Sequence, residues 1–195
     1  MNSRLSLIRA NIEKLIVLSD IEFDTFSKYL VLRNIPKKHK FLNAGEVCNY
    51  TGFITSGCLI TYTIDENGAE HVIQFAVEDY WIGDLYSFIT GSESAYNIEA
   101  TEDTTVLIIH KNDLEKVYEQ IPKFERFFRI LVQRSYVALQ HRITLNQRGT
   151  AQDKYENLLQ KIKGIELRST QKHIASYIGI TPESLSRLKR KLHNK

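Results

Sequence analysis

The chain has 195 residues, of which 43% are hydrophobic and 25% charged, so it is long enough to bury one large core or two smaller ones. Its apolar runs fall far below the roughly 20 residues that a membrane-spanning helix needs. Its first ten residues contain no continuous apolar stretch of the kind that directs export. We therefore predict a cytoplasmic protein without a membrane segment.

The net charge of +3 is divided unevenly along the chain. Residues 150–195 hold ten Lys or Arg residues against four Asp or Glu residues, so the rest of the chain is acidic overall. Binding to nucleic acid depends on local rather than total charge. The distribution predicts a small basic module that follows a larger, mildly acidic one.

The cysteine and histidine content argues against a metal centre. Cys48 and Cys58 cannot supply an iron-sulfur cluster or a four-ligand zinc site by themselves, and the six histidines are scattered without ligand spacing. We interpret the two thiols as reduced core residues. No metal and no cofactor is predicted.

The first part of the chain is expected to form helices and then strands. Apolar residues over 7–16 follow helical spacing, and Ser19 offers a cap for a second helix. Over 40–110, short runs of β-branched and aromatic residues alternate with turn signals such as Asn67-Gly68. Many short strands with regular turns are typical of a barrel or sandwich.

A long helix is predicted after Pro122, because residues 123–147 contain neither Gly nor Pro. One face follows alternating steps of four and three residues, as in a coiled-coil seam, and we expect it to bind a second copy of the chain. This predicted seam consists of Phe124, Phe128, Leu131, Ser135, Ala138, Arg142 and Leu145. Phe127 and Ile130, on an adjacent face, are expected to pack on the β domain. Gly149 ends the pattern and is the predicted hinge.

The last part of the chain has the pattern of a helix-turn-helix. Ser169-Thr170 precedes a short helix, and Gly179 supplies the sharp turn that follows it. Thr181 can cap the next helix and Pro182 suits its first position. Leu185, Leu188 and Leu192 would form the inner stripe of this second helix.

The outer face of the second helix carries residue types that bind DNA. Arginine can bond guanine in a bidentate way and glutamate can accept from cytosine, so the predicted base-reading residues are Glu183, Ser184 and Arg187. The predicted phosphate contacts are Thr170, Gln171, Lys172, Ser186, Lys189, Arg190 and Lys191. The alternative is a helical hairpin whose charged face is merely solvated.

Residues 174–187 resemble the DNA-binding end of the Crp-Fnr superfamily. Gly45-Glu46, residues 53–59 and Trp81-Ile82-Gly83-Asp84-Leu85 are similar to the β-roll and phosphate-binding cassette of the same superfamily. The resemblance implies an α+β fold with three parts. These are a β-roll (double-stranded β-helix, or jelly roll) sensor domain over 1–122, a dimerisation helix over 123–148 and a helix-turn-helix domain with a reduced wing over 149–195.

The cassette departs from the pattern of superfamily members that bind cyclic nucleotides. Those members have Gly-Glu-Leu and, about ten residues later, an arginine that pairs with the cyclic phosphate, where this chain has Ser94-Ala95. Serine cannot replace the charge-assisted pair of a guanidinium with a phosphate. We predict weak or no binding of cyclic AMP. The residues Gly83, Asp84, Leu85, Ser94 and Ala95 either contact an unidentified, less anionic ligand or form plain β-roll turns.

The sequence thus predicts a transcription regulator that binds an inverted-repeat site as a homodimer. Its expected partners are double-stranded DNA, a second copy of the chain, RNA polymerase and a small-molecule effector. Catalysis is not predicted, because no phosphate-binding Gly-rich loop, nucleophile elbow or His-Glu-x-x-His motif is present. The alternative is a small-molecule-binding or protein-interaction module whose basic C-terminal domain does not read DNA sequence.

Overall fold

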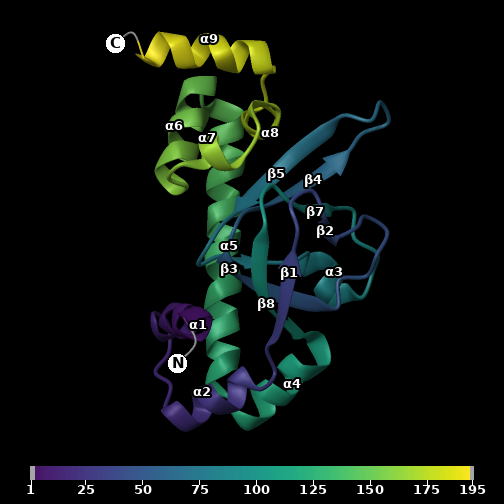
Figure 1. The fold of residues 1–195 in the computed structure, drawn as a ribbon, viewed down its shortest axis with the longest axis vertical. Coiled ribbons are helices and arrows are strands. Elements are labelled where there is room, and N and C mark those ends of the chain that lie inside the picture. The colour runs from purple at the N-terminus through teal and green to yellow at the C-terminus, as the bar shows by residue number, and fades with distance from the viewer. Residues whose placement is uncertain (1–2, 194–195) are drawn as a thin grey trace.

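The computed structural model describes residues 3–193, and a long helix joins its two parts (Figure 1). The chain opens with helices α1 (Ser3–Glu13) and α2 (Asp20–Ser27). Helix α2 begins with a capping box, in which the Ser19 hydroxyl accepts from the Glu22 backbone N–H and the Glu22 carboxylate accepts from the Ser19 N–H. The predicted cap at Ser19 is therefore confirmed.

The strands form two antiparallel sheets that face each other as a β-roll, which confirms the predicted fold class. One sheet has the order β1-β8-β3-β6 and the other has the order β2-β7-β4-β5. The strands are β1 (Val31–Ile35), β2 (Lys40–Leu42), β3 (Tyr50–Ser56), β4 (Leu59–Ile64), β5 (Glu70–Ala76), β6 (Trp81–Ile82), β7 (Asn97–Ala100) and β8 (Thr104–His110). Strand β5 is an edge strand, and the turn at Asn67-Gly68 joins it to β4, as predicted.

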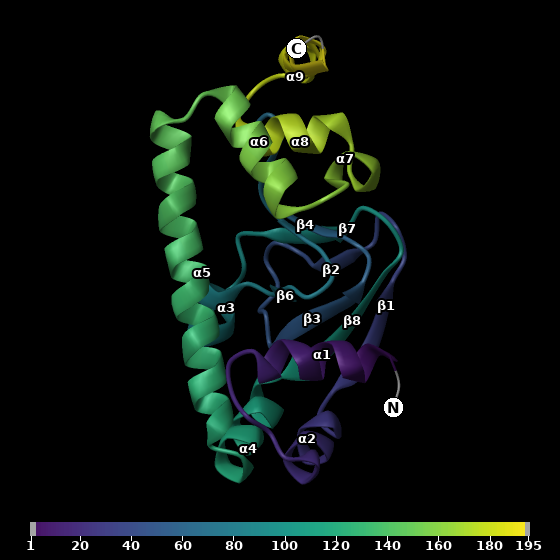
Figure 2. The ribbon, with the colours of Figure 1, turned by 90° about the vertical axis from the view of Figure 1, so that its left-hand side faces the viewer.

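Helices surround and extend this β-roll. They are α3 (Leu85–Thr90), α4 (Lys111–Gln120), α5 (Lys123–Arg148), α6 (Ala151–Lys161), α7 (Ile165–Arg168), α8 (Gln171–Ile178) and α9 (Pro182–His193). Helix α5 runs along the length of the molecule, and helices α6 to α9 form a C-terminal domain at its far end (Figure 2). Among the described residues, no helix is long and apolar enough to span a membrane.

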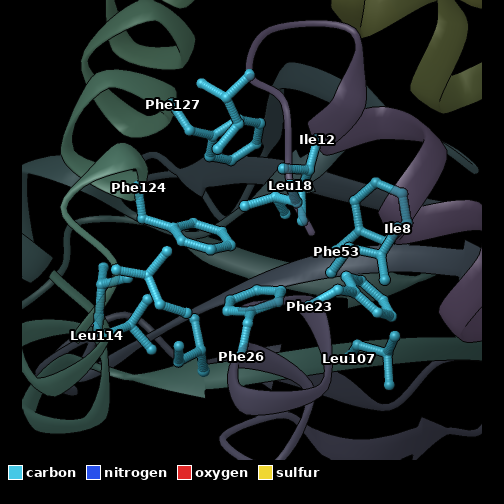
Figure 3. Close-up of a cluster of buried hydrophobic side chains, with 14 residues drawn as sticks. Ile8, Ile12, Leu18, Phe23, Phe26, Phe53, Leu107, Leu114, Phe124 and Phe127 are labelled. Carbon is cyan, nitrogen blue, oxygen red and sulfur yellow. The ribbon is translucent and has the colours of Figure 1, made fainter. Parts of the chain in front are cut away.

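Three clusters of buried side chains hold these parts together. Figure 3 shows the first, in which side chains of α1, α2 and α5 pack against β3 and β8. Phe124 of α5 stacks on Phe26 of α2 with ring centroids 4.4 Å apart. A second cluster fills the space between the two sheets. These two clusters fix the β-roll and the first half of α5 as one unit.

The third cluster is shared between the β-roll and the C-terminal domain. It joins Tyr62, Val72 and Phe75 of the β-roll to buried residues of α6 and α8. The two parts are thus packed against each other through apolar side chains, which the sequence pattern did not predict.

Two details at the domain boundary differ from the prediction or refine it. The stretch 164–168, expected to be a reduced β wing, forms a turn and the short helix α7, and no strand occurs after β8 in the described residues. Gly149 ends α5 with an ordinary extended conformation, and a Cβ there would lie 2.6 Å from the Leu145 carbonyl oxygen. Glycine is required at this boundary because the chain passes so close to the last turn of α5.

Candidate nucleic-acid interface

Helices α8 and α9 form a helix pair with well-defined ends. The Thr170 hydroxyl caps α8 by accepting from the backbone N–H of His173. Gly179 ends α8 in the left-handed conformation, with φ of 80°, where L side chains are strained. The Thr181 hydroxyl accepts from the backbone N–H of Ser184 at 3.2 Å. The predicted turn at Gly179 and the predicted start of α9 are therefore confirmed.

Helix α9 is fastened to the domain by the predicted leucine stripe. Leu185 has no exposed surface, and Leu188 and Leu192 pack against the same cluster, which includes Ile174 and Ile178 of α8. Burial of one face fixes the opposite face toward solvent.

The residues predicted to read bases lie on the exposed side of α9. Glu183 and Arg187 are exposed, and Ser184 is half-buried between them. The Arg187 guanidinium donates to the Ser184 hydroxyl at 2.9 Å. Hydrogen bonds from the backbone N–H of Glu183 itself and from the Thr181 hydroxyl lower the Glu183 pKa, as does the charge of Arg187. The carboxylate is therefore ionised and can accept hydrogen bonds near neutral pH.

The residues predicted to bind phosphates are less uniform in their surroundings. Arg190 and Lys191 are exposed on α9, and Gln171 is exposed at the start of α8. The Arg190 guanidinium lies 3.5 Å from the carbonyl oxygen of half-buried Ser186. This part of α9 presents cations to solvent.

Two of the predicted phosphate-binding lysines are engaged within the molecule instead. Lys172 forms an ion pair with Glu70 of β5 at 2.8 Å. The Lys189 side chain turns back to Glu166 and is only 20% exposed. In this arrangement Lys189 stabilises the C-terminal domain through a carboxylate that is distant in sequence and close in space. A phosphate contact by Lys189 would require this ion pair to open and stays a prediction.

Polar contacts fix the C-terminal domain on the β-roll, and sequence reasoning missed them. The Arg168 guanidinium donates to the carboxylates of Glu78 and Glu102 at 2.6–2.9 Å. The Ser176 hydroxyl accepts from the Val72 N–H at 2.9 Å and donates to the Glu70 carbonyl oxygen at 2.7 Å. These contacts bridge segments about 70 to 100 residues apart, so no local pattern could have revealed them.

Helix α5 turns part of the predicted seam toward the chain's own domains. Phe124 has no exposed surface, so its assignment to a contact between two copies was wrong. Phe128 and Leu131 pack against the same core cluster and are only partly exposed. The Arg142 guanidinium lies 4.4 Å above the Tyr177 ring and donates to the Val72 carbonyl oxygen at 3.4 Å. Ser135 and Ala138 are exposed and Leu145 is half-buried, and the contact predicted for them stays a prediction.

A different set of apolar residues on α5 is open to solvent. The exposed stripe consists of Val132, Tyr136, Leu139 and Ile143. Their exposed fractions are 38%, 60%, 49% and 42%, and they follow steps of four, three and four residues. This is the spacing of a coiled-coil seam, one face removed from the predicted one. The sequence of α5 has two adjacent apolar faces. Packing against the β-roll buries residues of one and leaves the other exposed.

Two of the predicted ligand-pocket residues, Asp84 and Ser94, form hydrogen bonds with nearby backbone groups. Asp84 is buried and caps α3, because its Oδ1 atom accepts from the backbone N–H groups of Tyr86 and Ser87. The Ser94 hydroxyl bonds to the backbone of Tyr96, and Leu85 is 43% exposed. The Asp84 Oδ2 atom is buried with no partner among the described residues. No guanidinium stands at position 94, where the superfamily's nucleotide-binding members have one.

The segments that carry these residues do come together. Gly45 and Glu46 exchange backbone hydrogen bonds with Ser94, and the Ser87 hydroxyl links Cys48 to Ser92. Gly83 lies against the backbone of β3, and Ala95 is exposed. Backbone and side-chain hydrogen bonds thus join the turns of the cassette, and both the ligand contact and the plain-turn alternative stay predictions.

The two thiols are core residues, as predicted. Cys48 and Cys58 are free and have no exposed surface. Burial raises the pKa of both thiols, that of Cys58 to about 11, so both stay protonated at neutral pH. Within residues 3–193, no three side chains of His, Cys, Asp or Glu gather as a metal site.

Comparison with known proteins agrees with this architecture. Residues 32–121 match the family of cyclic nucleotide-binding domains. The chain is 25% identical over 185 residues to the fumarate and nitrate reduction regulatory protein of Vibrio cholerae, covering 88% of this chain and 72% of that protein.

Solved structures share the fold at lower identity. FixK2 of Bradyrhizobium japonicum superposes with a TM-score of 0.75 at 20% identity, over 85% of each chain. The catabolite activator protein of Thermus thermophilus superposes with a TM-score of 0.58 at 19% identity, over 91% of this chain and 84% of that one. The chain thus combines a β-roll of the cyclic nucleotide-binding family with a long helix and a helix-turn-helix. Together, these matches support a transcription regulator of the Crp-Fnr superfamily.

Proposed function

We propose that this regulator binds an inverted-repeat site in double-stranded DNA as a homodimer, with one helix α9 reading each half-site. This proposal rests on the burial pattern of α9. Its outer face exposes Glu183, Arg187, Arg190 and Lys191, while Leu185 anchors the opposite face. Arg187 would bond guanine, and the ionised Glu183 would accept from cytosine. Arg190 and Lys191 would bind phosphates, together with Thr170 and Gln171 at the start of α8.

The proposed dimer forms through the exposed stripe on α5. Four apolar residues at coiled-coil spacing lose water when two copies pair, and the first two turns of their helix are already packed on the β-roll through an adjacent face. Leu139→Glu would place two like charges in this contact and should yield monomers in sedimentation equilibrium. Val137→Glu is the matched control, because Val137 is 66% exposed and lies off the stripe. Equal dissociation by both variants would count against the stripe.

The DNA-binding proposal is tested by selecting bound duplexes from a random pool with the purified protein at near-physiological salt. We expect a palindrome with half-sites about one helical turn apart. Arg187→Ala should cost about 1–3 kcal/mol and relax specificity at a guanine, whereas Lys191→Ala should weaken binding to all sequences alike. Equal losses on selected and random duplexes for both variants would favour the alternative module whose basic domain does not read sequence.

We also infer that cyclic AMP is not the effector. The position of the superfamily's cassette arginine is held by buried Ser94, whose hydroxyl already bonds to Tyr96, and Asp84 is committed to capping α3. A buried cyclic phosphate would lack its guanidinium partner there. Calorimetric titration with cyclic AMP should show no micromolar binding, and a micromolar dissociation constant would refute this inference. Any effector of the β-roll would be less anionic than a nucleotide.

A further inference from the structure

Helix α5 has a third surface, which neither the core nor the exposed stripe uses. We call it the basic face, and it consists of Arg126, Arg134, Val137, His141 and Arg148, all of them exposed. With about 3.6 residues per turn, these positions lie about 140° around the helix axis from the exposed stripe. Figure 2 shows α5 along one edge of the molecule, with the β-roll and the C-terminal domain on one side of it only. The basic face is therefore open to a partner.

The charges of the basic face are unpaired. Its arginines and His141 form no ion pair and no side-chain hydrogen bond with any described residue. The only acidic residue of α5 is Glu125, which lies on the line of the exposed stripe, so no i,i+4 ion pair is possible on the basic face. By contrast, cations on other elements, such as Arg9, Lys116 and Lys172, are paired with carboxylates. A surface with one sign of charge attracts a partner of the opposite sign.

The basic face also differs in charge from the domain on which α5 packs. Residues 1–122 hold eighteen Asp or Glu residues against ten Lys or Arg residues, whereas residues 123–148 hold one against six. The positions of the basic face lie about 110° around the axis from those that pack on the chain's own domains. Its arginines therefore point away from the acidic β-roll, and their complement must come from another molecule.

Apolar surface lies among these charges. Val137 is 66% exposed and lies between Arg134 and His141. At the start of α5 the basic face meets an open groove of about 450 Å³, lined by residues 13–17, Lys123 and Arg126. In this groove Val17 is 83% exposed. A partner that fits the whole surface would bury apolar side chains as well as pair with arginines.

We propose that the basic face binds an acidic amphipathic helix of a partner protein. Arg134, His141 and Arg148 are seven residues apart, so they recur about every 10.5 Å along α5. A second helix lying along α5 with a carboxylate in each heptad would meet all three, and its apolar side chains would cover Val137 and fill the groove. A nucleic-acid backbone would pair with the arginines but gain nothing from Val137 or Val17. The site goes beyond the proposed function, because it uses neither α9 nor the exposed stripe.

The test measures fluorescence anisotropy of a labelled synthetic peptide with the full-length protein at near-physiological salt. The peptide has about 24 residues, enough to span the basic face, with leucine and glutamate at heptad spacing. A scrambled peptide of the same composition and a duplex without a palindrome are the comparison probes. We expect saturable binding of the amphipathic peptide, one per subunit, and much weaker binding of the scrambled peptide.

Variants of the basic face assign the binding to its residues. Arg134→Gln and Arg148→Gln should each weaken the amphipathic peptide about two- to fivefold, the effect of losing one exposed ion pair. Val137→Ser should weaken it about tenfold through lost apolar contact, and α5 should persist because serine and valine have similar helix propensities. Lys163→Gln removes an exposed lysine between α6 and α7 and should leave the affinity unchanged. Helix content by circular dichroism and association state by sedimentation equilibrium should be those of wild type throughout.

Several outcomes would overturn this inference. They are the absence of saturable binding, equal affinity for the scrambled peptide, and equal affinity of wild type and all basic-face variants. Loss of affinity for the duplex without a palindrome, and not for the peptide, in Arg134→Gln and Arg148→Gln would assign the basic face to nucleic acid instead. Binding of the selected palindrome is measured separately on the same proteins, so failure of this inference and failure of the proposed function are distinguishable.

Discussion

Replacement of Arg168 by Gln tests how firmly the C-terminal domain is held on the β-roll. The guanidinium bonds to Glu78 and Glu102 at 2.6–2.9 Å, and the three side chains are 21%, 40% and 35% exposed. An exposed ion pair contributes about 0.2–1 kcal/mol, and removing one partner of a buried pair costs about 3–5 kcal/mol. Because solvent screens these half-exposed carboxylates, we expect a loss of about 2 kcal/mol for both pairs together.

The assay is urea unfolding of Arg168→Gln, Glu78→Gln, Glu102→Gln and the double variants. Each pair should show a coupling energy above about 0.5 kcal/mol, which is the signature of residues in contact. Arg142→Gln serves as a comparison, since that guanidinium contacts the same domain without a carboxylate partner in the described structure. Coupling energies indistinguishable from zero in both cycles would refute the argument that these ion pairs hold the domain.

The same contacts have a pH dependence. Burial alone would raise the pKa of Glu78, but hydrogen bonds from Arg168 and from backbone N–H groups outweigh burial and lower it. A carboxyl whose pKa is lower in the folded state adds stability above its unfolded pKa and loses it as the pH falls through the folded pKa. The Arg168→Gln variant should therefore be less stable than wild type near neutral pH, and its free energy of unfolding should fall less steeply as the pH is lowered. An unchanged acid profile would contradict this.

Three further outcomes are expected. Leu185→Ala should lower the free energy of unfolding by about 2.7–5 kcal/mol in urea, because it leaves a cavity under α9, and a loss well below this range would mean that α9 is held elsewhere. Phe124→Ala should lower the free energy of unfolding by about 3–5 kcal/mol and leave the proposed dimer intact. Tyr136→Glu should instead yield monomers in sedimentation equilibrium, and the reverse pattern would favour the seam predicted from sequence. Lys123 and Ser19 lower the pKa of Glu22 to about 2, so its contribution to the free energy of unfolding should be present above pH ~4.5 and lost toward pH 2. Glu22→Gln should therefore make stability less dependent on pH in acid unfolding monitored by circular dichroism.

Features determined by neighbours in the chain were predictable from sequence. Thr181 and Pro182 fix the start of α9, and Gly179 the end of α8, because capping and left-handed turns depend on residues within a few positions. The leucine stripe of α9 follows from helical periodicity alone. The β-roll was predictable as a class from short strands and turn signals, although the pairing order of its strands was not.

Features determined by distant residues were not predictable. Arg142 was placed in the seam by spacing, but its guanidinium stacks on Tyr177 in another domain. Lys189 has the same charge as its neighbours on α9, and only the position of Glu166 turns it inward. Asp84 offered a local signal, since aspartate is a favoured N-cap, and its capping of α3 could have been found by that rule.

The docking of α8 on β5 has a consequence for the solubility of the chain. An edge strand carries unpaired N–H and C=O groups that can recruit a strand from another molecule. Here Ser176 and Arg142 occupy the Val72 and Glu70 backbone groups of that edge. A chain cut after α5 would keep Arg142 but uncover the Val72 N–H and the Glu70 carbonyl oxygen, together with the apolar residues of the shared cluster. We therefore expect a β-roll without its C-terminal domain to self-associate.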